Sequence, residues 1–394
     1  MTDASSTDFE PTAGLSHADL SNWRERPHST WAFRNVRALM PCADVPNAPD
    51  RVQALPDRPA SLDAFQLRTR DGGALDLDQF LRATCTDGFV VLHDGHVVCE
   101  RYDGGLTPHA PHILMSATKS VVGLVVGVLA GNGGLDVDAT VGAIAPELAS
   151  TAFGNATLRQ LLDMRTGVVI DGEALDAYRA ATGWEPVRPG EAPADLANFF
   201  RQGAATHGAH GGPFRYVSAN TDLLGLLIER VTGRPFATLA SELLWQPMGA
   251  EDGAFITVDS RGAPRCTGGF CATARDLARV GQLVADDGRC GSRDVVPASW
   301  LEDIRQHADR AAWDQGEFAA GFAGLPMHYR SGWYAIDGAV QTLFAMGIHG
   351  QHLFVDRANR LVVAKLSSQA LPIDPVAMQL TLRAVQELRR CLQT

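Results

Sequence analysis

The chain has 394 residues, 45% hydrophobic and 20% charged, which is typical of a globular protein and excludes a disordered or fibrous one. Its net charge of -11 argues against nucleic-acid binding, because neutralising phosphates needs a surplus of Lys and Arg. The sequence has neither 18 consecutive apolar residues nor the start of a signal peptide, so we expect a cytoplasmic protein with no membrane partner.

Two residue types, cysteine and lysine, indicate which chemistry to expect. The seven cysteines are an odd number without C-x-x-C spacing, which favours free thiols over disulfides or a zinc site, and we expect no metal and no cofactor. Of the 34 basic residues, only Lys119 and Lys365 are lysines. Arginine keeps its proton in proteins, whereas a lysine amine can lose it. The two lysines are therefore candidates for positions that need a neutral amine.

The pattern of elements along the chain divides it into three parts. Residues 1–60 predict an irregular N-terminal arm. Strands and helices predicted in 61–150 and 270–394 form an α/β lobe, and 151–269 form a mostly helical lobe between them. The helical segments in and after the middle of the chain are 156–167, 221–233 and 273–288, and the last elements are strands at 352–356 and 360–368 followed by a helix at 378–392.

The region from Gly88 to Ala130 has the clearest local pattern. Two alternating apolar runs meet at Asp94-Gly95, a dipeptide typical of a two-residue β-hairpin turn. A nearly all-apolar segment at 117–130 then predicts a helix that is buried on every side.

A candidate nucleophile lies at the start of that helix. Ser116 and Lys119 are three residues apart, so one face of the first turn carries both. A serine hydroxyl needs an adjacent base, and a desolvated lysine can serve as one. The alternative, in which Ser116 only caps the helix and Lys119 is a surface charge, does not explain a lysine within an apolar segment. We therefore predict Ser116 as nucleophile and Lys119 as base.

These motifs resemble a known superfamily. The hairpin followed by HILMSATKSVVGLVVGVLAGNGGLD resembles the serine β-lactamases and penicillin-binding proteins, especially their class C-like branch. The segments NWRERPHSTWAFRNV, FRYVSANTDLLGLLIERVTG, GGFCATARDLARVG and GIHGQHLFVDRANRLVVAKLSS are similar to the 6-aminohexanoate-dimer hydrolases, which cleave nylon oligomers. The resemblance spans nearly the whole chain. It implies a β-lactamase-like α/β (α+β) fold with an antiparallel sheet flanked by helices.

The resemblance also implies a second motif after Ser116. It makes Tyr216 the proton relay of a Y-x-N/S motif, with Ser218 hydrogen-bonded to Lys119. A second register, Ser218-Ala219-Asn220, matches the S-x-N of related enzymes. The alternatives without function are a buried aromatic at Tyr216 and a helix cap at Asn220.

The third motif of the superfamily, K-T-G or H-x-G, corresponds here to residues 345–350. This segment has no lysine, the cation that meets a substrate carboxylate, which argues against penicillin as a substrate. We expect the backbone N–H groups of Ser116 and Ile348 to form the oxyanion hole. On the resemblance His349 packs behind the strand, and a Ser-His-Asp triad is the rival interpretation.

Substrate contacts are expected in loops where the resemblance is weakest. The stretch 171–184 is shorter than in the nylon-dimer hydrolases, and Tyr178 is the candidate replacement for the tyrosine that grips the leaving amine there. Thr267 falls where the resemblance places a loop that faces the substrate. The full set of candidate substrate-binding residues is Tyr178, Asn220, Thr267, Trp333 and His349.

The sequence therefore predicts a serine hydrolase that cleaves a small linear amide or ester through an acyl-enzyme. A 6-aminohexanoate oligomer and a short ester are the expected substrates. Ester cleavage is the easier reaction, because an alkoxide leaving group depends less on a proton donor than an amine does. The alternatives are a carboxylesterase or β-lactamase-like enzyme without amide-oligomer activity, and a non-catalytic penicillin-binding-like module. The sequence leaves the oligomeric state open, and a homodimer is the assembly that analogy suggests.

Overall fold

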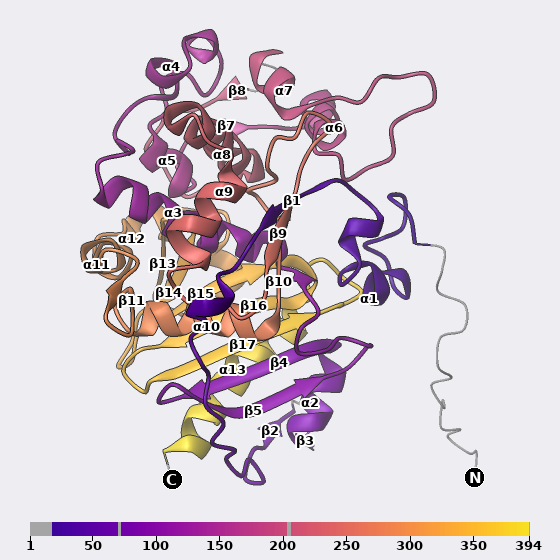
Figure 1. The fold of residues 1–394 in the computed structure, drawn as a ribbon, viewed down its shortest axis with the longest axis vertical. Helices are drawn as coiled ribbons and strands as arrows, with labels where there is room; N and C mark the ends of the chain where they lie inside the picture. Colours follow the sequence, from indigo (N-terminus) through magenta and orange to yellow (C-terminus); the bar gives the residue numbers. More distant parts are fainter. Residues whose placement is uncertain (1–17, 70–71, 203–205, 394) are drawn as a thin grey trace.

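A seven-stranded antiparallel sheet forms the centre of the lower half of the molecule in the computed structural model, which describes residues 18–69, 72–202 and 206–393 (Figure 1). Its strands come from both sides of the helical middle of the chain. In spatial order they are β13 (Met327–Arg330), β14 (Trp333–Ile336), β15 (Thr342–Gly347), β16 (Gln351–Asp356), β17 (Leu361–Ser367), β4 (Thr86–His93) and β5 (His96–Tyr102). The antiparallel sheet predicted from both ends of the chain is confirmed.

Helices cover both faces of this sheet. Successive residues of a strand point to opposite sides, and the strands carry apolar side chains on both sides, so each face packs against its own set of helices. On β17, Val362 and Ala364 pack into the same core as α3 (Thr118–Gly131) and α10 (Ala274–Ala285). Val363 packs into a second core with α2 (Leu77–Ala83) and α13 (Pro375–Leu392). Helix α13 begins three residues earlier than predicted, because Asp374 caps it and Pro375 suits the first helical position.

The predicted hairpin and buried helix are both present. Strands β4 and β5 are joined at Asp94 and Gly95, whose φ angles of 52° and 75° are those of the expected turn. Helix α3 carries Gly123, Gly127 and Gly131 on one face, and a Cβ at any of them would collide with Ser331, Trp300 or Pro297, respectively. The glycines therefore let neighbouring elements approach the helix closely, which explains why it is buried on every side except in its last turn.

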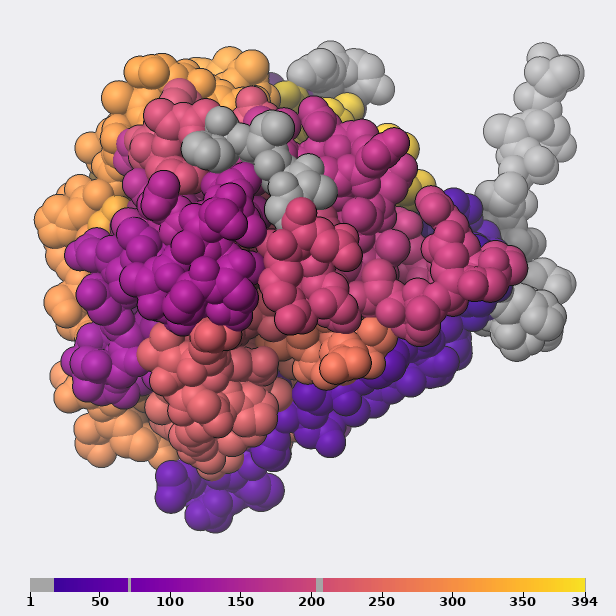
Figure 2. Space-filling model, turned by 90° about the horizontal axis from the view of Figure 1, so that it is seen from above, coloured from indigo at the N-terminus to yellow at the C-terminus, as the bar shows by residue number. Residues whose placement is uncertain are grey.

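The middle of the chain is mostly helical and lies at the top of the molecule (Figure 1); Figure 2 shows the face that it covers. The segment predicted as a helix at 156–167 is helical only to Leu162, because Met164 adopts a left-handed φ of 56°. The other helices are α1 (His28–Ala32), α4 (Val141–Ile144), α5 (Leu158–Leu162), α6 (Gly172–Ala181), α7 (Leu196–Gln202), α8 (Ser218–Thr232), α9 (Phe236–Ala240), α11 (Ala298–Gln306) and α12 (Arg310–Asp314).

The N-terminal arm is more regular than predicted. Its strand β1 (Cys42–Val45) pairs with β9 (Ala254–Thr257), in a second antiparallel sheet that continues through β10 (Phe270–Ala272) to β6 (His112–Ile113). Trp23 and Phe33 are buried beside this sheet, so the arm belongs to the core and not to a loose cover. The first 17 residues of the predicted arm lie outside the described residues.

The remaining strands form short pairs. They are β2 (Leu67–Arg68) with β3 (Ala74–Leu75), β7 (Val168–Val169) with β8 (Thr206–His207), and β11 (Arg289–Cys290) with β12 (Arg293–Asp294). Within the described parts of the chain, no helix combines the length and apolarity needed to cross a membrane. The boundaries expected for the two lobes stay a prediction.

Candidate active site

Ser116 lies in a short helical turn between β6 and α3. Met115 before it has a left-handed φ of 47°, a strained conformation for a residue with a side chain, and its own side chain is buried. Strand, strained residue and helix together hold Ser116 at a sharp bend of the chain. Ser116 is half-buried and lines two separate cavities.

The Lys119 amine lies directly behind Ser116. Its Nζ is 3.2 Å from Ser116 Oγ and donates a hydrogen bond of 2.7 Å to the Thr267 carbonyl. The pKa of Lys119 is lowered to about 7, mainly by burial. The negative charge of Asp222 opposes this shift, and the positive charge of Arg265 adds to it. A large share of the amine is therefore neutral near pH 7 and able to accept a proton.

Tyr216 approaches Ser116 from another direction. Its side chain is hydrogen-bonded to Ser116, and its ring centroid is 4.8 Å from Lys119 Nζ. The ring stacks on Phe318 at 5.2 Å, and the Tyr216 N–H donates to Glu317 at 2.6 Å. Burial raises the pKa of the Tyr216 phenol, which stays protonated at neutral pH. Near pH 7 the phenol is thus a proton donor and Lys119 the stronger candidate base.

The end of β15 forms the third side of the site. Gly347 packs so closely against the turn of Ser116 that a Cβ there would lie 2.5 Å from the Leu114 carbonyl oxygen and 3.0 Å from Met115 Cβ. This close approach brings the next residue, Ile348, to the walls of both cavities that Ser116 lines.

The two cavities that meet at Ser116 differ in character. The first, of about 530 Å³, is the more polar of the two, and its walls include both arginines (Arg24, Arg179, Arg215 and Arg265) and acidic residues (Asp171, Glu185 and Glu317). The second, of about 400 Å³, is lined mainly by apolar side chains from the ends of β15 and β16, the start of α13 and residues 317–325. Both sizes are typical of sites for small molecules. Among the described residues, no group of three or more His, Cys, Asp or Glu side chains is placed to hold a metal.

This geometry agrees with the matches to known proteins. The family model named Beta-lactamase matches residues 78–387. The chain belongs to the beta-lactamase family. It is 35% identical to the 6-aminohexanoate-dimer hydrolase of Paenarthrobacter ureafaciens, over 91% of this chain and 90% of that protein. Together these matches make it a serine hydrolase of amides or esters.

Solved structures show the same architecture. A Bacillus anthracis protein, provisionally named a 6-aminohexanoate-dimer hydrolase, superposes with a TM-score of 0.87 at 28% identity, covering 97% of this chain and 99% of that one. A family VIII carboxylesterase shares the fold, with a TM-score of 0.56 at 19% identity over 77% of this chain and 92% of that one. The predicted β-lactamase-like fold is thus confirmed.

Several sequence-based assignments need correction within this beta-lactamase fold. Lys119 bonds to the Thr267 carbonyl, where Ser218 was expected; Ser218 lines the polar cavity, and its carbonyl accepts the Thr267 hydroxyl at 2.7 Å. Asn220 was expected to contact substrate or cap the helix. It is fully buried inside α8, where its Oδ1 accepts the Thr166 hydroxyl at 3.1 Å.

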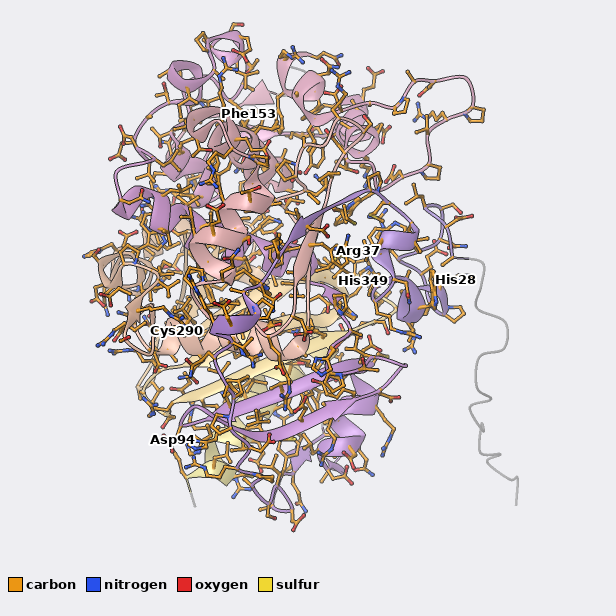
Figure 3. All side chains as sticks on the ribbon, in the orientation of Figure 1. His28, Arg37, Asp94, Phe153, Cys290 and His349 are labelled. Carbon is orange, nitrogen blue, oxygen red and sulfur yellow. The ribbon has the colours of Figure 1, made fainter. Side chains whose placement is uncertain are left out.

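Two further candidates do not reach either cavity. Trp333 is fully buried, and its indole N–H donates to the Ser120 carbonyl at 3.2 Å, which ties β14 to α3. His349, on the α1 side of the molecule (Figure 3), is buried with Nδ1 2.7 Å from the Gln369 carbonyl and its ring 5.3 Å from that of Phe33. Both assignments as substrate contacts are wrong, because these side chains are engaged in packing.

Sequence reasoning missed the buried ion pair below the site. Asp222 accepts hydrogen bonds from Arg265, from the Tyr178 hydroxyl at 2.5 Å and from the Thr267 N–H at 2.9 Å. Tyr178 does line the polar cavity, but its hydroxyl is occupied by Asp222. The pair therefore fixes the loop whose carbonyl receives Lys119. Its one signal in the sequence is an aspartate within an apolar helical segment.

Proposed function

We propose that Ser116 is the nucleophile of this hydrolase, that Lys119 is its base and that Tyr216 is its proton donor. One observation carries the proposal: Ser116 Oγ contacts both the Lys119 amine and the Tyr216 side chain at the point where two cavities meet. Near pH 7 a large share of the Lys119 amine is neutral and the Tyr216 phenol is protonated, because their pKa values are about 7 and well above 7, respectively, which gives the site a base and an acid.

The chemistry follows from these positions. Lys119 accepts the Ser116 proton as Oγ attacks the carbonyl, and the N–H groups of Ser116 and Ile348 stabilise the oxyanion. Tyr216 then protonates the leaving amine or alcohol, which departs and leaves an acyl-serine, and Tyr216 regains a proton from the Lys119 ammonium, so that both groups return to their starting states. Water attacks the acyl-serine, its proton passes to the neutral Lys119 amine, and Lys119 returns that proton to Ser116 Oγ as the acid departs.

We propose a small linear amide of the 6-aminohexanoate-oligomer type as substrate, together with carboxylesterase activity on short esters. The relative from Paenarthrobacter ureafaciens, whose name specifies the 6-aminohexanoate dimer, supports the amide. Arg215, which lines the polar cavity and forms no ion pair with another described residue, supports a substrate with a carboxylate at one end. The second candidate is a carboxylesterase without oligomer activity, which the fold shared with a family VIII carboxylesterase favours.

The decisive experiment is chromatographic detection of 6-aminohexanoate released from its linear dimer by the purified protein, with Ser116→Ala as blank. Release by the wild type alone supports the nucleophile and the amide substrate. Hydrolysis of p-nitrophenyl acetate without release of 6-aminohexanoate would favour the carboxylesterase. Equal release by Ser116→Ala would overturn the proposed nucleophile.

Two further proposals concern the cellular compartment and the oligomeric state of the protein. We propose the cytoplasm as its compartment, because the seven cysteines are an odd number without C-x-x-C spacing, which favours reduced thiols over a disulfide framework. We also propose a homodimer, which light scattering on the purified chain tests directly: a molar mass near 42.1 kDa would contradict it.

A further inference from the structure

The proposed proton donor, Tyr216, lies in irregular backbone just before α8. Residues 213–217 belong to neither a helix nor a strand, so their N–H groups depend on partners from other parts of the chain. The Phe214 N–H donates to the Ala312 carbonyl at 2.8 Å, at the end of the chain segment that follows α11. The N–H of Tyr216 itself donates to a side chain of the same segment, that of Glu317.

Glu317 holds this backbone at two points. Its Oε1 accepts the Tyr216 N–H at 2.6 Å, and its own N–H donates to the Phe214 carbonyl at 3.3 Å. A hydrogen bond from a backbone N–H to a carboxylate is stronger than one between neutral groups. Glu317 forms no ion pair with another described residue, so no cation of these parts of the chain competes for its carboxylate.

The neighbours of Glu317 in the sequence hold the ring of Tyr216. Phe318 stacks on this ring with centroids 5.2 Å apart, and Phe214 packs against Phe318 at 5.5 Å. Gly316 permits the close approach, because a Cβ there would lie 2.8 Å from the Phe214 carbonyl oxygen. One short segment therefore contacts both the main chain and the ring of Tyr216.

The anchored backbone and the reacting phenol are the two ends of one residue. The main chain of Tyr216 is bound to Glu317, while its side chain is hydrogen-bonded to Ser116. A shift of this main chain would carry the phenol away from Ser116. A misplacement of about 1 Å can cost about 10²-fold in rate, so the anchor matters for catalysis.

We propose that Glu317 is a positioning residue: its carboxylate anchors the main chain of Tyr216 and thereby keeps the phenol at Ser116 for proton transfer to the leaving group. Glu317 acts through the Tyr216 hydroxyl and exchanges no proton itself. The inference rests on the proposed function, because it takes Tyr216 as the proton donor. It adds a residue that lies outside the three sequence motifs of the site.

Two substitutions of Glu317 test the anchor. Glu317→Ala removes the acceptor and should lower kcat on the 6-aminohexanoate dimer by about tenfold, with KM within about twofold. Glu317→Gln keeps an acceptor oxygen and should stay within about threefold of the wild type. On p-nitrophenyl acetate both variants should stay within about threefold, because this leaving group needs no proton. If only esters are cleaved, ethyl acetate takes the place of the dimer.

Asp314→Ala is the matched control, since Asp314 is an exposed carboxylate of the same segment that lines neither cavity. It should change neither rate. Equal losses of kcat on the amide and the ester in Glu317→Ala would contradict the proposal. A raised KM with unchanged kcat would also overturn it, because the carboxylate would then contact the substrate.

A cycle with Tyr216→Phe distinguishes positioning from a general structural effect. A residue that acts only through the phenol has no further effect once the phenol is removed. Adding Glu317→Ala to Tyr216→Phe should therefore lower kcat on the amide by less than about twofold. A further tenfold loss in the double variant would overturn the proposal.

The same cycle separates this inference from the function on which it rests. If Tyr216→Phe keeps the wild-type rate on the amide, Tyr216 is not the donor and the proposed function fails at that point. If Tyr216→Phe loses about 10²-fold while Glu317→Ala matches the wild type, only the positioning inference fails. Glu317→Ala should still be labelled at Ser116 by a fluorophosphonate at nearly the wild-type rate, because fluoride leaves without a proton from Tyr216.

Discussion

The two lysines of the chain occupy similar environments and have different neighbours. Both are almost completely buried, and burial lowers the pKa of each to about 7. Each contacts a serine hydroxyl: Lys119 Nζ is 3.2 Å from Ser116 Oγ, and Lys365 Nζ is 2.5 Å from Ser367 Oγ. Ser116, however, lines two cavities, while Ser367 is fully buried in β17 and lines neither of them.

The difference shows what a depressed lysine pKa can and cannot indicate. A neutral amine beside a hydroxyl is necessary for this kind of nucleophile, but the same pair inside a sheet has no room for a carbonyl group. Lys365 also donates to the Thr84 carbonyl at 3.5 Å, and thereby links β17 to the segment before β4. We therefore assign catalysis to the first lysine and a packing role to the second.

Replacing each lysine by methionine should give the largest difference in activity between the two sites. Lys119→Met removes the base and should lower kcat/KM for p-nitrophenyl acetate by about 10³-fold. Lys365→Met replaces one buried chain with another of similar length and should leave kcat/KM within about threefold. Steady-state kinetics on both purified variants gives the ratio. Comparable losses in the two variants would remove the distinction between the lysines.

Tyr216→Phe should have the next largest effect. It removes the proton donor and keeps the ring that stacks on Phe318, so the loss should depend on the leaving group. We expect a loss of about 10²-fold on amides and a clearly smaller one on p-nitrophenyl esters, whose leaving group needs no proton. Parallel kinetics on one amide and one ester measures the difference. Equal losses on both would argue for a structural role of the phenol.

The buried pair below the site should matter for stability. Asp222→Asn leaves Arg265 charged and buried without its carboxylate, which should cost about 3 kcal/mol of unfolding free energy. It also removes the negative charge that raises the pKa of Lys119, so the rate profile should move to lower pH. Denaturant unfolding and a pH–rate profile read out the two effects separately. An unchanged unfolding free energy would contradict the placement of the pair.

The pH dependence of stability should reflect both lysines. Their folded pKa values of about 7 lie below the ordinary 10.5, so between pH 7 and 10.5 the unfolded chain binds more protons. The unfolding free energy should therefore rise with pH there, by up to about 1.4 kcal/mol per pH unit for each lysine.

The pH dependence of activity should follow the protonation of Lys119 alone. The kcat/KM should rise with pH through about 7, in the wild type and in Lys365→Met, because the base must be neutral. Lys365→Met should instead lose about half of the lysine-dependent slope of stability. A rate profile that moves in Lys365→Met would show that the two amines are coupled.

Local patterns predicted the elements that carry the site, and tertiary contacts decided the rest. The Asp94-Gly95 turn, the apolar helix and the spacing of Ser116 and Lys119 depend on neighbours in the sequence. The partners of Asp222 lie 43 to 45 residues away, so no local motif connects them. Trp333 was misassigned for the same reason, because only the packing of β14 shows that it faces inward. The resemblance already implied that His349 packs behind the strand, and its side chain is buried there against Phe33.

Fluorophosphonate labelling followed by peptide mapping tests the central claim most directly, because it reports which serine is activated. We predict a label at Ser116 in the wild type and in Lys365→Met, at similar rates, and almost none in Lys119→Met. A label at Ser367, or the same labelling rate in both lysine variants, would contradict the assignment of the nucleophile to the serine–lysine pair that faces the cavities.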